Sequence, residues 1–323
     1  MKRLILILLL LISLCGCKSK IENEVYFYSY FDTVSLIKSY KDDEATFERK
    51  VNDVEKIMHR YHEMLDTFND HDVMGLYKLN EYAGEKEIVI DEELFDFLVF
   101  AKEIYYKTNG KTNVMMGALT NIWKKAISEE MLPNEADLKK ASEHINIESL
   151  VLDKDKHTAY IDDKDACIDV GGVAKGYVCK IIKEELGEDL DGYSISLGGN
   201  VILFGTKGDG SLYKVGVKDP FNAGKLLDKF ELSDVSLVTS GNYERYFELD
   251  GRKYHHIIDS STLYPSFKYA SVTIVYDDSS IADAFSTALF CLDVDESKRI
   301  LANYPGIQAI LVTLDGEIIK LNF

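Results

Sequence analysis

Residues 244–258, ERYFELDGRKYHHII, decide the fold class, because two segments rich in aromatic and apolar residues flank Asp250-Gly251. Asp-Gly is a preferred two-residue turn, since both of its positions tolerate positive φ, and it predicts an antiparallel hairpin. The pattern recurs further along the chain, where residues 307–314 and 317–321 flank Asp315-Gly316. Two such hairpins favour an α+β protein with mixed or antiparallel sheets packed with helices over a doubly wound parallel sheet.

Other short apolar segments, rich in Tyr, Val and Ile, predict further strands. They are residues 25–37, 149–152, 158–161, 193–197, 212–217 and 235–239. Helices are expected where apolar residues recur three and four positions apart. They are residues 51–65, 94–105, 173–186 and 281–292, with one more after Pro133-Asn134. No linker divides residues 25–323, so we expect one folded unit there.

The composition limits the classes of partner. The chain has 323 residues and is 46% hydrophobic, which is enough apolar material for a real core. Its 37 Lys+Arg against 55 Asp+Glu give a net charge of −18. Nucleic-acid binding draws its affinity largely from basic side chains that neutralise phosphates, so no nucleic-acid partner is expected. The total charge does not exclude a local phosphate site.

The first residues resemble a bacterial lipoprotein signal. Two basic residues precede an apolar run, residues 4–12, which is shorter than the roughly 20 residues needed to span a membrane. The run ends in Leu14-Cys15-Gly16-Cys17 and then turns polar. We therefore expect residues 1–16 to be a signal peptide, Cys17 to carry lipid such as palmitate, and residues 17–24 to be a tether. The protein would then be extracytoplasmic and lipid-anchored to the cell membrane; the alternative is an uncleaved anchor helix.

Three cysteines remain after this segment, at positions 167, 179 and 291. They are an odd number, widely spaced, and form no CxxC pair, which predicts neither a disulfide framework nor a zinc site. Because their neighbours are apolar, we expect them to be small buried hydrophobic residues.

Residues 169–177, DVGGVAKGY, join a predicted strand to a predicted helix. Gly171 and Gly172 allow the backbone to approach a ligand closely, and the N–H groups of a helix N-terminus attract anions. Lys175 adds a positive charge to a chain that is otherwise acidic. The spacing differs from that of a Walker A loop. A plain strand-to-helix turn is the alternative.

Two more segments rich in glycine and hydroxyl groups border predicted strands, residues 196–200 (SLGGN) and 238–245 (VTSGNYER). Ser240 and its neighbours can face a pyrophosphate or a sugar, although polar loops are common. A β-bulge or a tight turn explains SLGGN equally well.

Two adjacent histidines, His255 and His256, close a predicted strand. Neighbouring side chains on a strand point to opposite faces, so at most one of them enters a given site. Neutral imidazole is a suitable base for a hydroxyl proton near pH 7. The carboxylate of Asp259, three residues after His256, favours such a role. A structurally bonded histidine is the alternative.

Asp283 and Thr287 stand four residues apart at the start of an apolar helix, and therefore on one of its faces. A carboxylate and a hydroxyl form half of an oxygen-only site, which suits Mg²⁺ together with phosphate oxygens of a substrate. The alternative is that Asp283 only caps the helix or interacts with its dipole.

These motifs, in this order, resemble those of the ApbE family, the FAD:protein FMN transferases. The matching segments are DVGGVAKGY from 169, SLGGN from 196, TSGNYER from 239, HIID from 256 and ADAFSTA from 282. Phe31-Asp32-Thr33, Phe68, Asn80 and Trp123 match as well, so the resemblance covers about residues 25–323.

The resemblance implies a single T-fold-like catalytic unit that uses Mg²⁺ to cleave FAD, passes FMN to a Thr or Ser hydroxyl of a membrane flavoprotein, and releases AMP. The acceptor would be an electron-transfer subunit. The resemblance also implies Asp283 and Thr287 as metal ligands, with a backbone carbonyl at Gly172 as a third. Asp283 and His256 would be catalytic, His256 by assisting deprotonation of the acceptor hydroxyl. The implied FAD contacts are Phe31, Thr112, Asn113, Val114, Asp169, Lys175, Ser240, His256 and Ile257.

Three segments depart from the family pattern. Residues 260–265, SSTLYP, stand where the family has Pro-x-Thr-Gly-x-Pro. Without the glycine a positive-φ turn is costly, which predicts a loop of different shape. Phe31-Asp32-Thr33 replaces Met-Gly-Thr, and residues 112–115 replace Phe-Asp-Pro-Thr.

Two other functions stay open. An FAD pyrophosphatase would make FMN and AMP with water as the nucleophile. A non-catalytic flavin-binding lipoprotein would bind FAD tightly and release no AMP.

Overall fold

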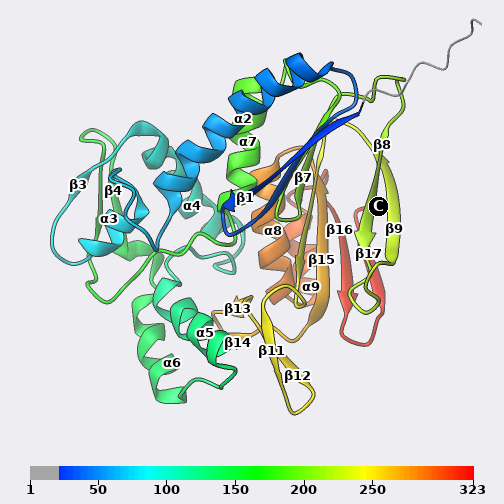
Figure 1. The fold of residues 1–323 in the computed structure, drawn as a ribbon. Coiled ribbons are helices and arrows are strands. Elements are labelled where there is room, and N and C mark those ends of the chain that lie inside the picture. Colours follow the sequence, from blue (N-terminus) through cyan, green and yellow to red (C-terminus); the bar gives the residue numbers. More distant parts are fainter. Residues whose placement is uncertain (1–21) are drawn as a thin grey trace, which may run out of the picture.

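The computed structural model describes residues 22–323, so the predicted signal peptide and Cys17 lie outside the described residues. An eight-stranded sheet lies at the centre of the molecule, and all its neighbouring strands are antiparallel (Figure 1). In spatial order the strands are β1 (Asn23–Tyr30), β2 (Thr33–Ser39), β6 (Tyr193–Leu197), β7 (Asn200–Phe204), β10 (Ser236–Gly241), β15 (Tyr269–Tyr276), β16 (Gln308–Thr313) and β17 (Ile318–Leu321).

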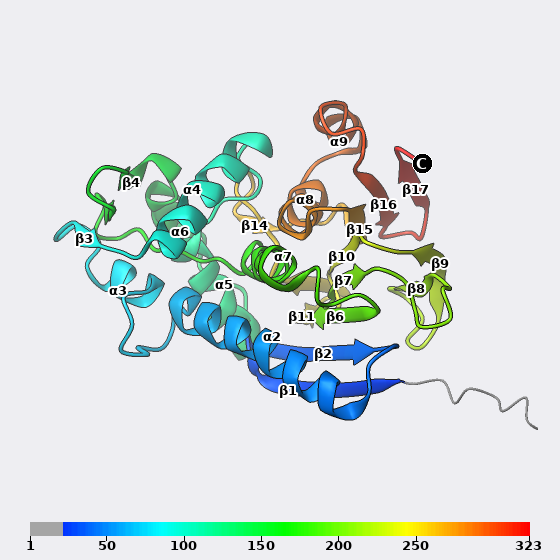
Figure 2. The ribbon, with the colours of Figure 1, turned by 90° about the horizontal axis from the view of Figure 1, so that it is seen from above.

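Three helices lie side by side on one face of this sheet (Figure 2). They are α2 (Glu44–Leu65), α7 (Ala174–Leu186) and α8 (Ser279–Cys291). The side chain of Asp43 caps α2 by accepting from the Thr46 N–H. α8 is buried on nearly all sides because it lies between α7 and the strands β10 and β15. This position explains its continuous apolar sequence.

A two-stranded ribbon, β8 (Tyr213–Lys218) and β9 (Leu226–Leu232), covers part of the other face of the sheet. Val217 of the ribbon and Leu237 of β10 are buried in the core between ribbon and sheet. The next residue of β10, Val238, belongs to the core that includes α8. Alternate residues of one strand therefore serve two different cores.

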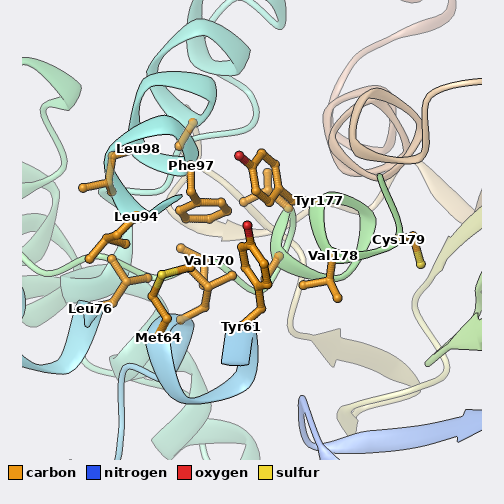
Figure 3. Close-up of a cluster of buried hydrophobic side chains, with 14 of the residues drawn as sticks. Tyr61, Met64, Leu76, Leu94, Phe97, Leu98, Val170, Tyr177, Val178 and Cys179 are labelled. Atoms are coloured by element: carbon orange, nitrogen blue, oxygen red, sulfur yellow. The ribbon is translucent and has the colours of Figure 1, made fainter. Parts of the chain in front are cut away.

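A second group of elements packs beside these helices. It comprises α3 (Leu76–Glu81), α4 (Glu92–Lys107), α5 (Gly117–Glu129), α6 (Glu135–Ala141), the short 3-10 helices Ser142–His144 and Ile147–Ser149, and the sheet β3 (Ile88–Val89), β5 (Thr158–Ile161) and β4 (Leu150–Asp153). Figure 3 shows where the two groups meet: Phe97 of α4 faces Tyr177 of α7, with ring centroids 5.0 Å apart. Val170, in the loop before α7, belongs to the same cluster, so the core fixes that loop.

The fold class predicted from the sequence is confirmed. Asp250-Gly251 forms the turn between β11 (Tyr246–Leu249) and β12 (Arg252–His255), and both residues have positive φ. Asp315-Gly316 connects β16 to β17. SLGGN is the turn of the β6–β7 hairpin, with both glycines at positive φ. The predicted strand 252–258 ends at His255, and Ile258 belongs to a separate two-residue pairing of β13 (Ile258–Asp259) with β14 (Tyr264–Pro265).

Some boundaries and elements differ from the predictions. β1 begins at Asn23, so two residues assigned to the tether pair with β2. The central strand β15, the helix α5 and the helix α9 (Val294–Leu301) had no predicted counterpart. The expectation of buried cysteines is confirmed for Cys179 and Cys291, whereas Cys167 is half-buried; all three are free thiols. Within residues 22–323, no helix combines the length and apolar character needed to cross a membrane.

Candidate active site

A cavity of about 880 Å³ is lined by residues of α2, α5, α7, α8 and β10. This volume lies in the upper part of the range of small-molecule sites. Every site residue predicted from the sequence within the described chain lines it. These are Phe31, Thr112, Asn113, Val114, Asp169, Gly172, Lys175, Ser240, His256, Ile257, Asp283 and Thr287. Motifs spread over more than 250 residues therefore meet in one place.

Helices α7 and α8 approach so closely that position 176 accepts only glycine. A Cβ there would lie 2.3 Å from the Cβ of Asp283 and 2.4 Å from the carbonyl oxygen of Ser279. The Gly176 N–H donates to Oδ2 of Asp283 at 2.8 Å, and the Ser279 hydroxyl donates to the Gly176 carbonyl at 2.7 Å. Gly176 thereby brings the carboxylate of α8 to the N-terminal turn of α7.

Asp283 does not cap α8. That role belongs to Asp278, whose side chain accepts from the N–H groups of Ser280 and Ile281. Asp283 is buried, and this burial raises the pKa of its carboxyl group, opposed by the Lys175 ammonium and the Gly176 N–H. Because an ionised buried carboxylate is costly without a partner, this position favours a bound cation.

The groups around Asp283 fit Mg²⁺. Thr287 lies one turn further along α8, and a Cβ placed on Gly172 would be 3.2 Å from its Oγ1, so the loop backbone and this hydroxyl are adjacent. A carboxylate, a hydroxyl and a backbone carbonyl make an oxygen-only donor set, which Mg²⁺ prefers. The donor chemistry thus agrees with the residues predicted as ligands.

Asn200 was not predicted as a site residue, yet it supports the same interpretation. It is 2% exposed and lines the cavity, and its side chain is near enough to lower the pKa of Asp283. Its Nδ2 nevertheless makes no hydrogen bond of normal geometry within the described chain. Buried polar atoms are almost always paired, so this amide, which has only a poorly aligned contact with Asp283, is available to a ligand such as a phosphate oxygen.

The loop before α7 is braced from two sides. Asn80 bonds the backbone of Ile168 through both ends of its amide, at 2.7 and 3.1 Å. Asp169 accepts from the Thr120 hydroxyl at 2.5 Å and the Gly171 N–H at 2.9 Å, and pairs with Lys124 at 2.9 Å. Burial by itself would raise the pKa of Asp169, but Lys124 and these hydrogen bonds hold it below its usual range. The carboxylate predicted to contact FAD is therefore already paired, and it shapes the loop.

Lys175 is more available. Its Nζ donates to the Gly171 carbonyl at 3.1 Å and lies at the cavity wall. The other cationic side chains that line the cavity are Lys111, Lys124 and Arg245. None of these three was predicted as a site residue, because Lys111 and Lys124 lie outside the quoted motifs and Arg245 ends one of them with no sign that it faces a ligand.

Four of the predicted FAD contacts are tied to the protein by their polar groups. The Thr112 hydroxyl donates to the Ala284 carbonyl at 2.7 Å, and the Asn113 amide donates to the Ile145 carbonyl at 2.8 Å. The carbonyl of Val114 accepts from the Asp169 N–H. Ser240 shares a hydrogen bond of 2.7 Å with Ser286. Because these polar groups are bonded within the protein, the four residues hold fixed positions. A ligand in the cavity would contact them through their other atoms.

The two histidines have separate environments, as predicted. His255 is buried and its Nε2 bonds the Ser266 carbonyl at 2.8 Å, whereas His256 lines the cavity. Burial, followed by the nearby Arg245 guanidinium, holds the pKa of His256 well below its usual range. Its Nδ1 lies 3.4 Å from the Arg245 carbonyl. Because a carbonyl only accepts, this long contact favours the tautomer with the proton on Nδ1, in which Nε2 is the basic nitrogen.

The expectation that the Asp259 carboxylate supports a role of His256 is wrong. Its carboxylate pairs with Lys111 at 2.8 Å and accepts from the Ser261 N–H at 2.9 Å. Asp259 therefore organises the loop after β13. In that loop Leu263 itself adopts φ +65°, so the left-handed turn is present without the glycine. The Trp123 indole holds this turn by donating to the Leu263 carbonyl at 2.8 Å.

Phe31 lies in the turn between β1 and β2, where it and Asp32 both have positive φ, 55° and 50°. Its ring meets the imidazole of His62 edge-on at 5.5 Å, and its N–H approaches Nδ1 of the same ring at 3.4 Å. Two non-glycine residues in this conformation are strained, and such strain gathers at functional sites.

Comparison with known proteins identifies the family. Residues 31–311 match the family model described as the ApbE family. The chain belongs to the ApbE family. A relative from Klebsiella pneumoniae named FAD:protein FMN transferase is 30% identical over 92% of both chains. A second relative of the same name, from Treponema pallidum, is 29% identical over 94% of this chain and 88% of its own.

Solved structures of the family share this fold. A crystal structure of the ApbE protein from Thermotoga maritima has a TM-score of 0.83 and 26% identity, covering 93% of this chain and 97% of that one. The flavin transferase ApbE from Vibrio cholerae has a TM-score of 0.78 at 20% identity, with the same coverage. The ApbE resemblance seen in the motifs is therefore confirmed over nearly the whole chain.

Proposed function

We propose that this protein is a Mg²⁺-dependent flavin transferase that moves FMN from FAD to a Thr or Ser hydroxyl of an acceptor protein and releases AMP. The observation that carries this proposal is the junction of α7 and α8, where Asp283, Thr287 and the unpaired amide of Asn200 share one cavity with His256. Membership of the ApbE family and the names of the curated relatives support the proposal.

Asp283, Thr287 and the backbone at Gly172 would hold Mg²⁺, which when bound supplies neutralisation of the pyrophosphate charge. Lys175, the N-terminal turn of α7 and the Asn200 amide would bind further phosphate oxygens. The ring of Phe31, which lines the cavity, offers aromatic surface to a flavin ring. Phosphoryl transfer needs chiefly such positioning and charge compensation.

The reaction is a substitution at phosphorus. The acceptor hydroxyl oxygen forms a bond to the phosphorus of the FMN half, and the P–O bond to the AMP phosphate breaks, so AMP leaves with that electron pair. The hydroxyl proton passes to Nε2 of His256, whose imidazole is neutral near pH 7 and can accept it.

The acceptor that we propose is an extracytoplasmic membrane flavoprotein of the electron-transfer type. Attachment of the enzyme to the membrane by a lipid on Cys17 would place both proteins on the same surface. Loss of palmitate labelling in Cys17→Ser, with the chain still expressed, is the expected result; unchanged labelling would contradict it.

The test is AMP release by the full-length protein in detergent, with FAD and Mg²⁺, in the presence and absence of an acceptor domain. We expect AMP release to depend on the acceptor, and Asp283→Asn to abolish it. Asp277→Asn changes an exposed carboxylate just before α8 and serves as the matched control.

Each alternative function gives its own result. Equal AMP release without an acceptor would identify an FAD pyrophosphatase. Tight FAD binding with no AMP under any divalent cation would identify a passive flavin-binding protein.

A further inference from the structure

A second group of metal-ligating side chains lines the same cavity near the turn of Phe31. His62, Asp66 and His71 are all half-buried, and their ligand atoms lie within 4.8 Å of one another. His62 and Asp66 also line the cavity. We propose that these three side chains bind a divalent transition-metal cation, such as Zn²⁺ or Co²⁺, at a site separate from the one formed by Asp283. This inference goes beyond the proposed flavin transfer.

The local sequence brings the three groups together. His62 and Asp66 are four residues apart at the end of α2, where the Asp66 N–H donates to the His62 carbonyl at 3.0 Å. The Asp66 carboxylate then accepts from the N–H groups of Phe68 and Asn69, at 2.7 and 3.2 Å, which turns the chain back. His71 returns to the helix end as a result, with Nε2 2.7 Å from the Asp66 carboxylate and its ring 5.5 Å from that of His62.

The donor set selects the class of cation. Two imidazoles and one carboxylate suit Zn²⁺ and related transition metals, whereas Mg²⁺ prefers oxygen donors. Ligand atoms in a tetrahedral zinc site are separated by about 3.4 Å, given bonds of about 2.1 Å. Small side-chain rotations therefore suffice to convert the observed cluster into a ligand set.

The number of ligands also suits metal binding, because the three side chains each offer one ligand atom to a common centre. Three protein ligands leave a coordination position open, as in many zinc sites that bind a further ligand.

A cation here would act on the turn of Phe31, which lines the cavity. The Phe31 N–H reaches the His62 ring at 3.4 Å, a long contact with which a cation competes easily. Fixing His62 in a coordination sphere would fix the edge-on contact between its ring and that of Phe31. The site is therefore placed to control the strained turn between β1 and β2.

Titration of the full-length protein with Co²⁺, followed by visible absorption, tests the proposal. We expect an intense band typical of four-coordinate Co²⁺ at one equivalent, and its displacement by Zn²⁺. His71→Asn should weaken Co²⁺ binding at least tenfold, on the order of the loss seen when ligand geometry is disturbed. His62→Gln should do the same.

Two control variants separate this site from others. His144→Gln removes the histidine of the cluster of His144, Asp163 and Asp165 and should leave the band unchanged. Asp283→Asn should abolish AMP release and keep the band, so failure of the proposed function and failure of this site are distinguishable. An absent band, or a band that persists in His71→Asn, would overturn the proposal and leave Asp66 with only a turn-forming role.

Discussion

At the scale of single residues, the site is distinguished by polar groups that the ligand-free protein leaves without adequate partners. Asp283 is a buried carboxylate whose pKa is raised by burial, and the Nδ2 of Asn200 beside it makes no hydrogen bond within the described residues. A protein selected for stability alone would replace such groups, since each costs about 1–3 kcal/mol. Their presence together is best explained by a bound cation and a phosphate.

Asn200→Leu separates stability from function. We expect the free energy of unfolding without ligand to fall by less than about 1 kcal/mol, because only the poorly aligned contact of the amide with Asp283 is lost. AMP release should fall at least tenfold, since a phosphate hydrogen bond is lost. Thermal unfolding and AMP release measured on one preparation provide the check. Full activity in the variant would show that the amide has no ligand.

His256→Ala should slow flavin transfer much more than it weakens FAD binding. Positioned general bases contribute about 10²–10⁴-fold, so we expect a rate loss of at least 100-fold with a change in the Kd for FAD below about threefold. His59→Ala, on the exposed face of α2, is the control. Equal transfer rates in His256→Ala and the wild type would refute the role as a base.

The buried imidazole of His255 should make the stability of the protein depend on pH. Burial lowers its pKa from 6.5 to about 4 in the folded protein. The unfolded chain therefore binds the proton more tightly, so stability is constant above pH 6.5 and falls as the pH decreases from 6.5 to 4. The loss is at most roughly 3 kcal/mol. Denaturant unfolding at pH 7 and 4.5 should show a smaller loss in His255→Gln; an identical loss would exclude His255 as its source.

At the scale of secondary-structure elements, the decisive feature is the close approach of α7 to α8. Gly176→Ala places a Cβ 2.3 Å from the Asp283 Cβ, which forces the helices apart. We expect a loss of about 1–3 kcal/mol in unfolding free energy and a weaker affinity for Mg²⁺. Gly306→Ala, whose Cβ would meet its nearest neighbour at 3.3 Å, is the control. An unchanged melting temperature and Mg²⁺ dependence in Gly176→Ala would contradict this account.

Elements with a local signal were predictable. The hairpins at Asp250-Gly251 and Asp315-Gly316 follow from turn chemistry, and α2, α4 and α7 follow from apolar periodicity. β15 was missed because it is buried on both faces and its sequence, YASVTIVY, lacks alternation. α5 was missed because its N-cap position is Met116, which provides no side-chain cap.

The site residues also divide into those with a local sequence signal and those without one. Residues in contiguous motifs, such as Asp169 and Asp283, were found, because their spacing is visible along the chain. Lys111 and Lys124 reach the cavity from outside the quoted motifs, so no short-range pattern marks them. Asn200 and Arg245 end the motifs SLGGN and TSGNYER, but nothing in those motifs distinguishes them from loop residues. The expectation that Asp259 supports His256 failed because proximity in sequence does not show that Lys111 pairs with the carboxylate.

At the scale of the whole molecule, the net charge of −18 repels an anionic ligand such as FAD. Four basic side chains line the cavity, but five carboxylates line it too, so an anion is favoured there only where Lys175 and a bound cation offset the local negative charge. The remaining surface keeps its excess of carboxylates, which repel one another.

This self-repulsion predicts a salt effect on stability. Raising the NaCl concentration from about 0.02 M to about 0.5 M shortens the screening length to a few ångströms and should raise the melting temperature by a few degrees. Sucrose of equal osmolality is the control for non-ionic effects. A fall in melting temperature would mean that favourable ion pairs outweigh the repulsion.

The central claim is that the cavity transfers FMN to a protein hydroxyl, and the mass of the acceptor tests it most directly. The full-length protein is incubated with FAD, Mg²⁺ and an acceptor domain, and the acceptor is analysed by intact-mass and peptide mass spectrometry. The account predicts a gain equal to one FMN on a single Thr or Ser, and none with Asp283→Asn. An unmodified acceptor with FAD consumed would contradict transfer in favour of hydrolysis, and an unmodified acceptor with FAD intact under every divalent cation would contradict catalysis altogether.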